Sequence, residues 1–329
     1  MLKTISLYGL GIVVIVCCGI ICLSIGRYQV PLSEIVACFV GECEQTHKNV
    51  IFEFRLPRIV LAIVMGIGLS VSGAAFQSLF KNPLATPDIL GVTSGASFGA
   101  VLALLFGLGI LYVGLFGLIF GIVALLIVGL ISYDKAMPYN TITMILSGII
   151  VSALFQSLVS LIKYIADPQD TLPTITYWLL GSLDSSFTPQ VYVGIIGVIV
   201  GSVVIFLLAW KINLLALDDD EAKTLGVRLG LLRVVVIIAT TFIVACSVSL
   251  CGIIGWIGLL VPHIARLLVG SDNSKLIPLC VVIGAVFMMC VDTLSRSIST
   301  NQIPISILTA LVGAPFFIYI LHKNKGMRL

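Results

Sequence analysis

The chain has 329 residues, of which 59% are hydrophobic and only 10% are charged, whereas soluble domains are about 25% charged. Its mean hydropathy is +1.20, and apolar stretches of about 20 residues, the length needed to cross a bilayer, recur along it. This composition excludes a soluble enzyme, a secreted disulfide scaffold and a nucleic-acid-binding protein. The sequence predicts an all-α integral membrane protein with a single transmembrane domain over residues 1–329.

Ten apolar segments are predicted to span the membrane. The uncharged stretch from Ala96 to Ile131 is 36 residues long, about 54 Å as one helix, so it must turn back on itself, and Gly107, Gly109 and Gly114 around Leu111 are the expected turn. Residues 234–261 could form one tilted helix or two short ones, and the charge distribution decides between them. The first segment has a longer apolar core than a secretory signal, so we expect it to remain uncleaved. The predicted spans are 5–25, 59–79, 91–110, 112–131, 141–165, 190–210, 231–250, 252–269, 276–294 and 303–321.

The basic residues predict the orientation, because cytoplasmic loops of membrane proteins are enriched in Lys and Arg. With ten spans, 12 basic residues lie on the side of both termini and 6 on the other side, whereas nine spans give 8 against 10. We therefore expect a multi-pass protein of the bacterial cytoplasmic (inner) membrane with both termini in the cytoplasm. The six basic residues expected outside are Arg27, Lys48, Arg55, Arg58, Lys163 and Arg296.

The cysteines and histidines do not form a recognisable catalytic or metal site. Seven of the nine cysteines lie in or beside predicted spans, where buried small apolar residues are the ordinary interpretation. Cys38 and Cys43 lie in the predicted external segment, where a disulfide is chemically permitted but its Cα separation is unknown from sequence. The three histidines belong to separate regions, so no metal site is expected.

The carboxylates argue against ion coupling. Nearly all lie in predicted loops, and the exception, Asp292, is placed near a span end where it pairs with Arg296 at i+4. An ion-coupled secondary transporter normally keeps an ionisable residue near the membrane midplane. A polytopic membrane enzyme would cluster His, Asp or Glu at one membrane depth, and the sequence predicts no such cluster.

The sequence also contains no phosphate-binding G-x-x-x-x-G-K-[ST] motif, so the energy for transport is expected from a separate ATPase.

The longest predicted cytoplasmic connection, residues 211–230, is the candidate contact for that ATPase. Four acids precede Ala222-Lys223-Thr224-Leu225-Gly226, a pattern typical of a short helix with acids at its positive end and a glycine stop. An ordinary solvated helix and a coupling helix held in a partner's groove are equally consistent with this pattern. The candidate coupling residues are Leu217, Asp218, Asp219, Asp220, Glu221, Ala222, Leu225, Gly226 and Val227.

Three arginines stand at the predicted external edge of the membrane. Arg55 and Arg58 are three residues apart before the second span, and Arg296 follows Asp292 near the end of the ninth. Long cationic side chains at this level ordinarily reach into lipid headgroups. Alternatively, their guanidinium groups bind carboxylates of an external partner.

Several ordered motifs resemble the FecCD-type permeases, the membrane subunits of binding-protein-dependent ABC importers for iron-siderophore complexes, haem and cobalamin. The matching blocks follow the family's order from Arg55 to the C-terminus, so only about the first 50 residues lack one. They are Arg55 to Arg58, Gly73 to Gln77, Asn82 to Ala96, Tyr177 to Ser182, Leu225 to Val227, Gly252 to Arg266, Gln302 to Ala310 and Gly313 to Phe317.

The resemblance implies a ten-helix permease of the cobalamin and siderophore (type II) kind, working as a dimer with two ATP-binding subunits and an extracytoplasmic substrate-binding protein. It implies that residues 211–230 are the coupling element and that Arg55, Arg58 and Arg296 meet carboxylates of the binding protein. It places Asn140, Thr141 and Thr143 in the region that narrows the pathway on the cytoplasmic side. ATP and Mg would be held by the partner ATPase, and no cofactor or metal by this chain.

The cargo expected from this resemblance is an iron-siderophore complex, with haem or cobalamin as alternatives. Whether the second permease is an identical copy or a paralogue stays open. The chain departs from the family pattern at Ser271-Asp272-Asn273-Ser274 and at Ile305-Ser306. These departures leave the expected fold unchanged.

Overall fold

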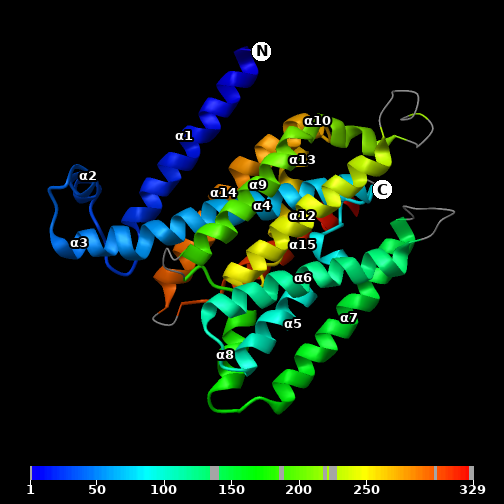
Figure 1. Cartoon of the computed structure of the whole chain (residues 1–329). Helices are drawn as coiled ribbons and strands as arrows, with labels where there is room; N and C mark the ends of the chain where they lie inside the picture. Colours follow the sequence, from blue (N-terminus) through cyan, green and yellow to red (C-terminus); the bar gives the residue numbers. More distant parts are fainter. Residues whose placement is uncertain are drawn as a thin grey trace.

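The computed structural model describes residues 2–133, 141–184, 189–217, 221, 228–299 and 302–325, and within these it is helical without strands (Figure 1). The long helices are α1 (Leu2–Ser24), α4 (Leu56–Leu79), α6 (Ile110–Ser132), α7 (Thr141–Ile165), α9 (Pro189–Leu207), α12 (Leu229–Cys251), α14 (Asn273–Ile298) and α15 (Ile305–Lys325). The shorter ones are α2 (Leu32–Val40), α3 (Gln45–Asn49), α5 (Val92–Leu105), α8 (Thr171–Leu179), α10 (Ala209–Ile212) and α13 (Ile257–Val269). Three further turns are η1 (Val50–Arg55), η2 (Pro87–Leu90) and η3 (Asn213–Ala216).

Each of the ten predicted spans corresponds to a helix. Among the described residues, five helical segments are long and apolar enough to cross a membrane, and a sixth, α9 with α10 and η3, bends by 64°. Four shorter apolar helices, in α1, α5, α13 and α15, account for the rest. The fold is the ten-helix arrangement that the sequence predicts.

The helical boundaries differ from prediction where backbone breaks interrupt a span. We expected helices over 91–110 and 252–269, but α5 has 14 residues and α13 has 13. The turn after α5 lies at residues 106–109, where two of the expected turn glycines stand and Gly107 adopts a positive φ of 64°, so the helix ends five residues before the predicted end of its span. The apolar composition that marks a span does not require that all of it be helical.

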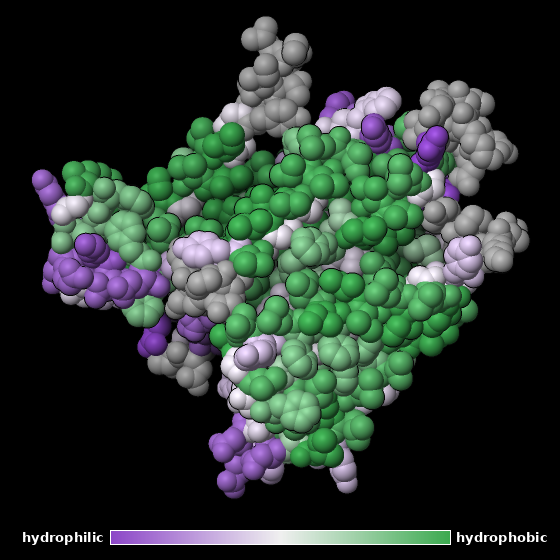
Figure 2. Space-filling model, viewed as in Figure 1, coloured by the Kyte–Doolittle hydropathy of each residue, from purple (hydrophilic) through white to green (hydrophobic). Residues whose placement is uncertain are grey.

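The centre of the bundle is α4, which packs against α9, α12, α13 and α14. In the most apolar 18-residue window of the helix that contains α4, 83% of the residues are buried. The corresponding share is 22% in α6 and 28% in α7. The apolar faces of α6 and α7 remain exposed, and Figure 2 shows the resulting continuous apolar surface. In water such a surface would aggregate, so it is the surface that faces lipid or another membrane subunit.

The bundle has two distinct ends. The end that holds Arg55, Arg58 and Arg296 is called the arginine end, and the opposite one, with α10 and η3, the loop end. Since α1 finishes beside Arg55 and α15 begins beside the last turn of α14, the start of α1 and the end of α15 both point to the loop end (Figure 1). The cytoplasmic placement of both termini stays a prediction.

The segment between α1 and α4 forms a small projection at the arginine end. It contains α2 and α3, and Cys38 and Cys43 are joined by a disulfide with a Cα–Cα distance of 4.7 Å. The sequence left this pairing open because the turn between the two residues, closed by Gly41 with a φ of 94°, is not visible in residue spacing.

Candidate transport and coupling sites

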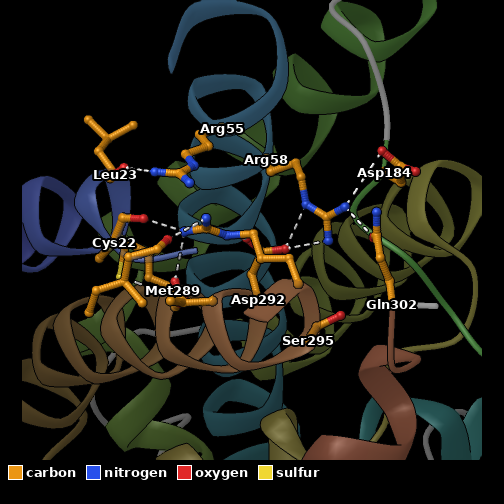
Figure 3. A network of polar contacts seen from close by, with 12 residues as sticks. Cys22, Leu23, Arg55, Arg58, Asp184, Met289, Asp292, Ser295 and Gln302 are labelled. Carbon is orange, nitrogen blue, oxygen red and sulfur yellow. Dashed lines mark hydrogen bonds and ion pairs between the residues drawn. The ribbon is translucent and has the colours of Figure 1, made fainter. Parts of the chain in front are cut away.

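A network of buried charges joins the helices at the arginine end (Figure 3). Asp292 of α14 is fully buried and accepts from two arginines. Arg58 of α4 donates from Nε and Nη2 to Asp292 Oδ1 at 3.0 and 2.7 Å, and Arg296 Nε donates to Asp292 Oδ2 at 3.3 Å. The predicted Asp292–Arg296 pair is therefore confirmed, and Arg58 is a partner that the sequence did not indicate.

The remaining donors of these arginines bind backbone and side-chain oxygens. Arg296 Nη1 donates to the carbonyl of Ile25 at 2.6 Å, and Arg55 donates to the carbonyls of Leu23, Ser24 and Tyr28. Arg58 Nη1 also contacts the side chains of Gln302 and, at 3.5 Å, Asp184. Arg55 and Arg296 thereby fasten the end of α1 to η1 and α14, and Arg58 joins α4 to α14.

A cavity of about 460 Å³ opens between these residues. Four arginines but only two acids, Glu53 and Asp184, line it. Arg27 is exposed and has no ion pair or hydrogen bond within the described part of the chain. The excess of cations makes this cavity a place where an anionic group would be stabilised. Its lining residues include Arg27, Tyr28, Glu53, Arg55, Arg58, Asp184, Arg296 and Gln302.

The structure brings together the three arginines expected to dock a binding protein, since all three line this cavity. Arg55 and Arg58 are each only 5% exposed, so a partner could reach them only through the cavity. Their docking role stays a prediction. Sequence reasoning placed Arg27 outside the membrane but did not single it out, because no motif contains it.

A second polar region lies inside the bundle, where two helices begin. The segment before α5 folds back, so that Asp88 of η2 and Leu69 from the middle of α4 line the same cavity of about 30 Å³. The sequence placed Asp88 in a loop between two spans, and the structure places it in η2, in the connection between α4 and α5, where it is exposed. Its carboxylate accepts a hydrogen bond from the hydroxyl of Thr93 in the first turn of α5. Asp88 therefore has a structural partner, and its position does not by itself indicate ion coupling.

At the loop end, only part of the predicted coupling segment can be placed. Leu217 is half-buried and its carbonyl accepts from Lys81 Nζ at 3.2 Å, while Glu221 is exposed. The other candidates, Asp218, Asp219, Asp220, Ala222, Leu225, Gly226 and Val227, lie outside the described residues. Their role in coupling stays a prediction.

The predicted gate region lies at the start of α7. Thr141 and Thr143 are half-buried in its first turn, and Asn140 lies outside the described residues. Thr141 borders a cavity of only about 10 Å³ with Leu79, Phe80 and Arg233. The gate assignment is not tested by this geometry.

No group of three or more His, Cys, Asp or Glu side chains in the described part of the chain is arranged to hold a metal ion. The polar groups at the two ends of the bundle are guanidinium, carboxylate and amide side chains.

Comparisons with known proteins agree with this arrangement. The model of the FecCD transport family matches residues 13–323. The molybdate import system permease protein MolB of Haemophilus influenzae is 40% identical over 97% of this chain and 96% of its own. A probable iron chelatin transport system permease of Helicobacter pylori (strain 26695) is 36% identical over 84% of each chain. A solved chain described as a metal-chelate type ABC transporter in an inward-facing conformation matches with a TM-score of 0.88 and 39% identity, over 97% of this chain and 99% of its own. The chain therefore belongs to the FecCD transport family and is a membrane permease of the ABC importer kind.

Proposed function

We propose that this permease works as one half of a dimer, with two ATPase subunits at the loop end and a substrate-binding protein at the arginine end. The loop end is then cytoplasmic. The excess of Lys and Arg expected there by the positive-inside rule supports this orientation. ATP and Mg would be bound by the ATPase subunits, because this chain has no phosphate-binding loop of its own.

The cargo that we propose is a small metal oxyanion of the molybdate class. The observation that carries this proposal is the 40% identity to MolB over nearly the full length of both chains. The cationic lining of the cavity at the arginine end supports an anionic cargo or an anionic partner surface. ATP binding would close the ATPase pair, and the coupling segments would then switch the dimer pathway from outward-facing to inward-facing.

An iron-siderophore complex is the second candidate cargo. The similarity to the Helicobacter permease and to the chain described as a metal-chelate transporter favours it. Haem and cobalamin, which the family's motifs also allow, rank behind these two.

The cargo is tested by uptake into proteoliposomes that contain the permease, its ATPase and the binding protein. We expect radioactive molybdate to accumulate only with ATP inside and to be displaced by tungstate, which has the same shape and charge. Accumulation of a ferric chelate instead would support the second candidate. Uptake driven by a cation gradient without the ATPase would contradict the importer mechanism altogether.

The docking proposal predicts a role for Arg27. Because its guanidinium is exposed at the cavity rim, Arg27→Glu should slow association of the binding protein about 3- to 10-fold at low salt, and the difference should shrink at high salt. Surface plasmon resonance with the permease in nanodiscs measures this rate. Lys48→Glu, an exposed cation on α3 that does not line the cavity, is the matched control. Equal association rates for wild type and Arg27→Glu would remove Arg27 from the docking surface.

A further inference from the structure

Asparagine side chains tie the start of the coupling segment to two transmembrane helices. Asn213 opens η3, four residues before Leu217. Its Oδ1 accepts from the backbone N–H and from Nδ2 of Asn273, at 2.8 and 2.9 Å, and its Nδ2 donates to Asp272 Oδ1 at 2.9 Å. Ser78 of α4 donates from its hydroxyl to Asn273 Oδ1 at 3.0 Å. We call these four residues, Ser78, Asn213, Asp272 and Asn273, the amide clasp.

The hydrogen bonds of the amide clasp hold η3, α4 and the start of α14 in one relative geometry. Asn273 is only 4% exposed, and both its amide nitrogen and its amide oxygen are used. The hydrogen bond from Asn213 lowers the pKa of Asp272, so this carboxylate is ionised at neutral pH. An ionised acceptor strengthens the hydrogen bond that it receives. Asp272 also accepts from the backbone N–H of Ser274 at 3.0 Å and so caps α14.

The two helices held by the clasp lie in close backbone contact. A Cβ added to Gly66 of α4 would lie 2.2 Å from the carbonyl oxygen of Gly284 of α14, so the two backbones touch without side chains between them. Ser70 donates to the carbonyl of Cys280 at 2.9 Å, one turn further along. At the arginine end the same helices are joined through Arg58 and Asp292. The helices α4 and α14 are thus fastened at both ends and in the middle.

We propose that Asn213 and Asn273 are positioning residues that transmit movement of the coupling segment to the α4–α14 pair and, through it, to the arginine end. The inference rests on the proposed function of residues 211–230. From Ser78 to Arg58 is 20 residues, about 30 Å of α4. A rigid α4–α14 pair of this length links the coupling segment to the arginine end. Binding of a partner at either end then changes the binding free energy of the partner at the other end by the same amount.

The test compares ATP hydrolysis with and without loaded binding protein, in nanodiscs that hold the whole complex. We expect Asn213→Ala to lower the ratio of stimulated to unstimulated hydrolysis by about 5-fold or more, the range in which coupled sites typically interact. Asn213→Asp should do the same, because it places a second carboxylate against Asp272. Lys275→Ala is the control, since Lys275 is exposed and contacts Asp272 only at 4.0 Å.

Exchanging the side chains of Asn213 and Asp272 tests whether the lost stimulation of ATP hydrolysis can be restored. The double variant Asn213→Asp with Asp272→Asn reverses the direction of the hydrogen bond, keeps an acceptor for Asn273, and keeps a residue that caps helices well at 272. We expect it to regain most of the stimulation. Failure of the double variant to regain what Asn213→Asp loses would overturn the inference, as would a wild-type ratio in Asn213→Ala. A wild-type complex without stimulation would overturn the proposed function and this inference together.

Discussion

Asp292→Ala is expected to be among the most destabilising single substitutions in this chain. The carboxylate is fully buried between Arg58 and Arg296, and its removal leaves Arg296 without an acidic partner and Arg58 with only the exposed Asp184 at 3.5 Å, within the described part of the chain. Breaking a buried pair from one side costs about 3–5 kcal/mol. We expect a lower yield of folded protein and a lower midpoint of thermal unfolding in detergent.

A matched control is available at the same end of the bundle. Glu53 is exposed at the cavity and has no ion pair within the described residues, so Glu53→Ala removes the same charge and should change stability by no more than about 0.5 kcal/mol. If Asp292→Ala unfolds at the temperature of Glu53→Ala, the buried network does not hold α4 and α14 together.

The second large effect is expected at the crossing of α4 and α14. In Gly66→Val the new side chain would overlap the backbone of Gly284, which cannot rotate away as a side chain could. Overpacking of this kind costs about 1–3 kcal/mol or more. Here it would also separate two helices whose association within a membrane depends on close packing. We expect thermal unfolding at a lower temperature and loss of ATP-dependent uptake.

The control is a glycine of another helix. A Cβ at Gly129 of α6 would meet no atom within 4 Å, so Gly129→Val should fold and transport normally. Normal uptake by Gly66→Val would show that the α4–α14 contact tolerates separation, and it would weaken the case for a rigid pair.

Much of this fold can be predicted from composition. The helix α7, Thr141–Ile165, coincides with the predicted span 141–165, because a long apolar stretch between polar loops leaves little choice in a bilayer. The short helices α5 and α13 could not be predicted in this way. Hydropathy reports apolar composition, and the turn after α5 at residues 106–109 and the irregular residues 252–256 before α13 are as apolar as the helices beside them.

Among the site contacts, only those within one helix can be predicted from the sequence. The pairing of Asp292 with Arg296 follows from their i+4 spacing on one helix. The pairing of Arg58 with Asp292 joins residues 234 positions apart, and that of Asn213 with Asn273 joins residues 60 apart. Such contacts depend on which helices are neighbours, and spacing along a single sequence does not contain that information. The sequence shows the polar departure from the family pattern at residues 271–274, but it does not show that Asn213 is the residue that contacts it.

The breaks before α5 and α13 have a consequence for the hydration of the bundle. The first N–H groups of any α-helix lack partners within the helix, and here two such helix starts border the same cavity of about 30 Å³. A space of this size holds about two water molecules. Polarity at this cavity is thus supplied by backbone dipoles of two helix starts together with the side chains of Asp88 and Thr93, which line it as well.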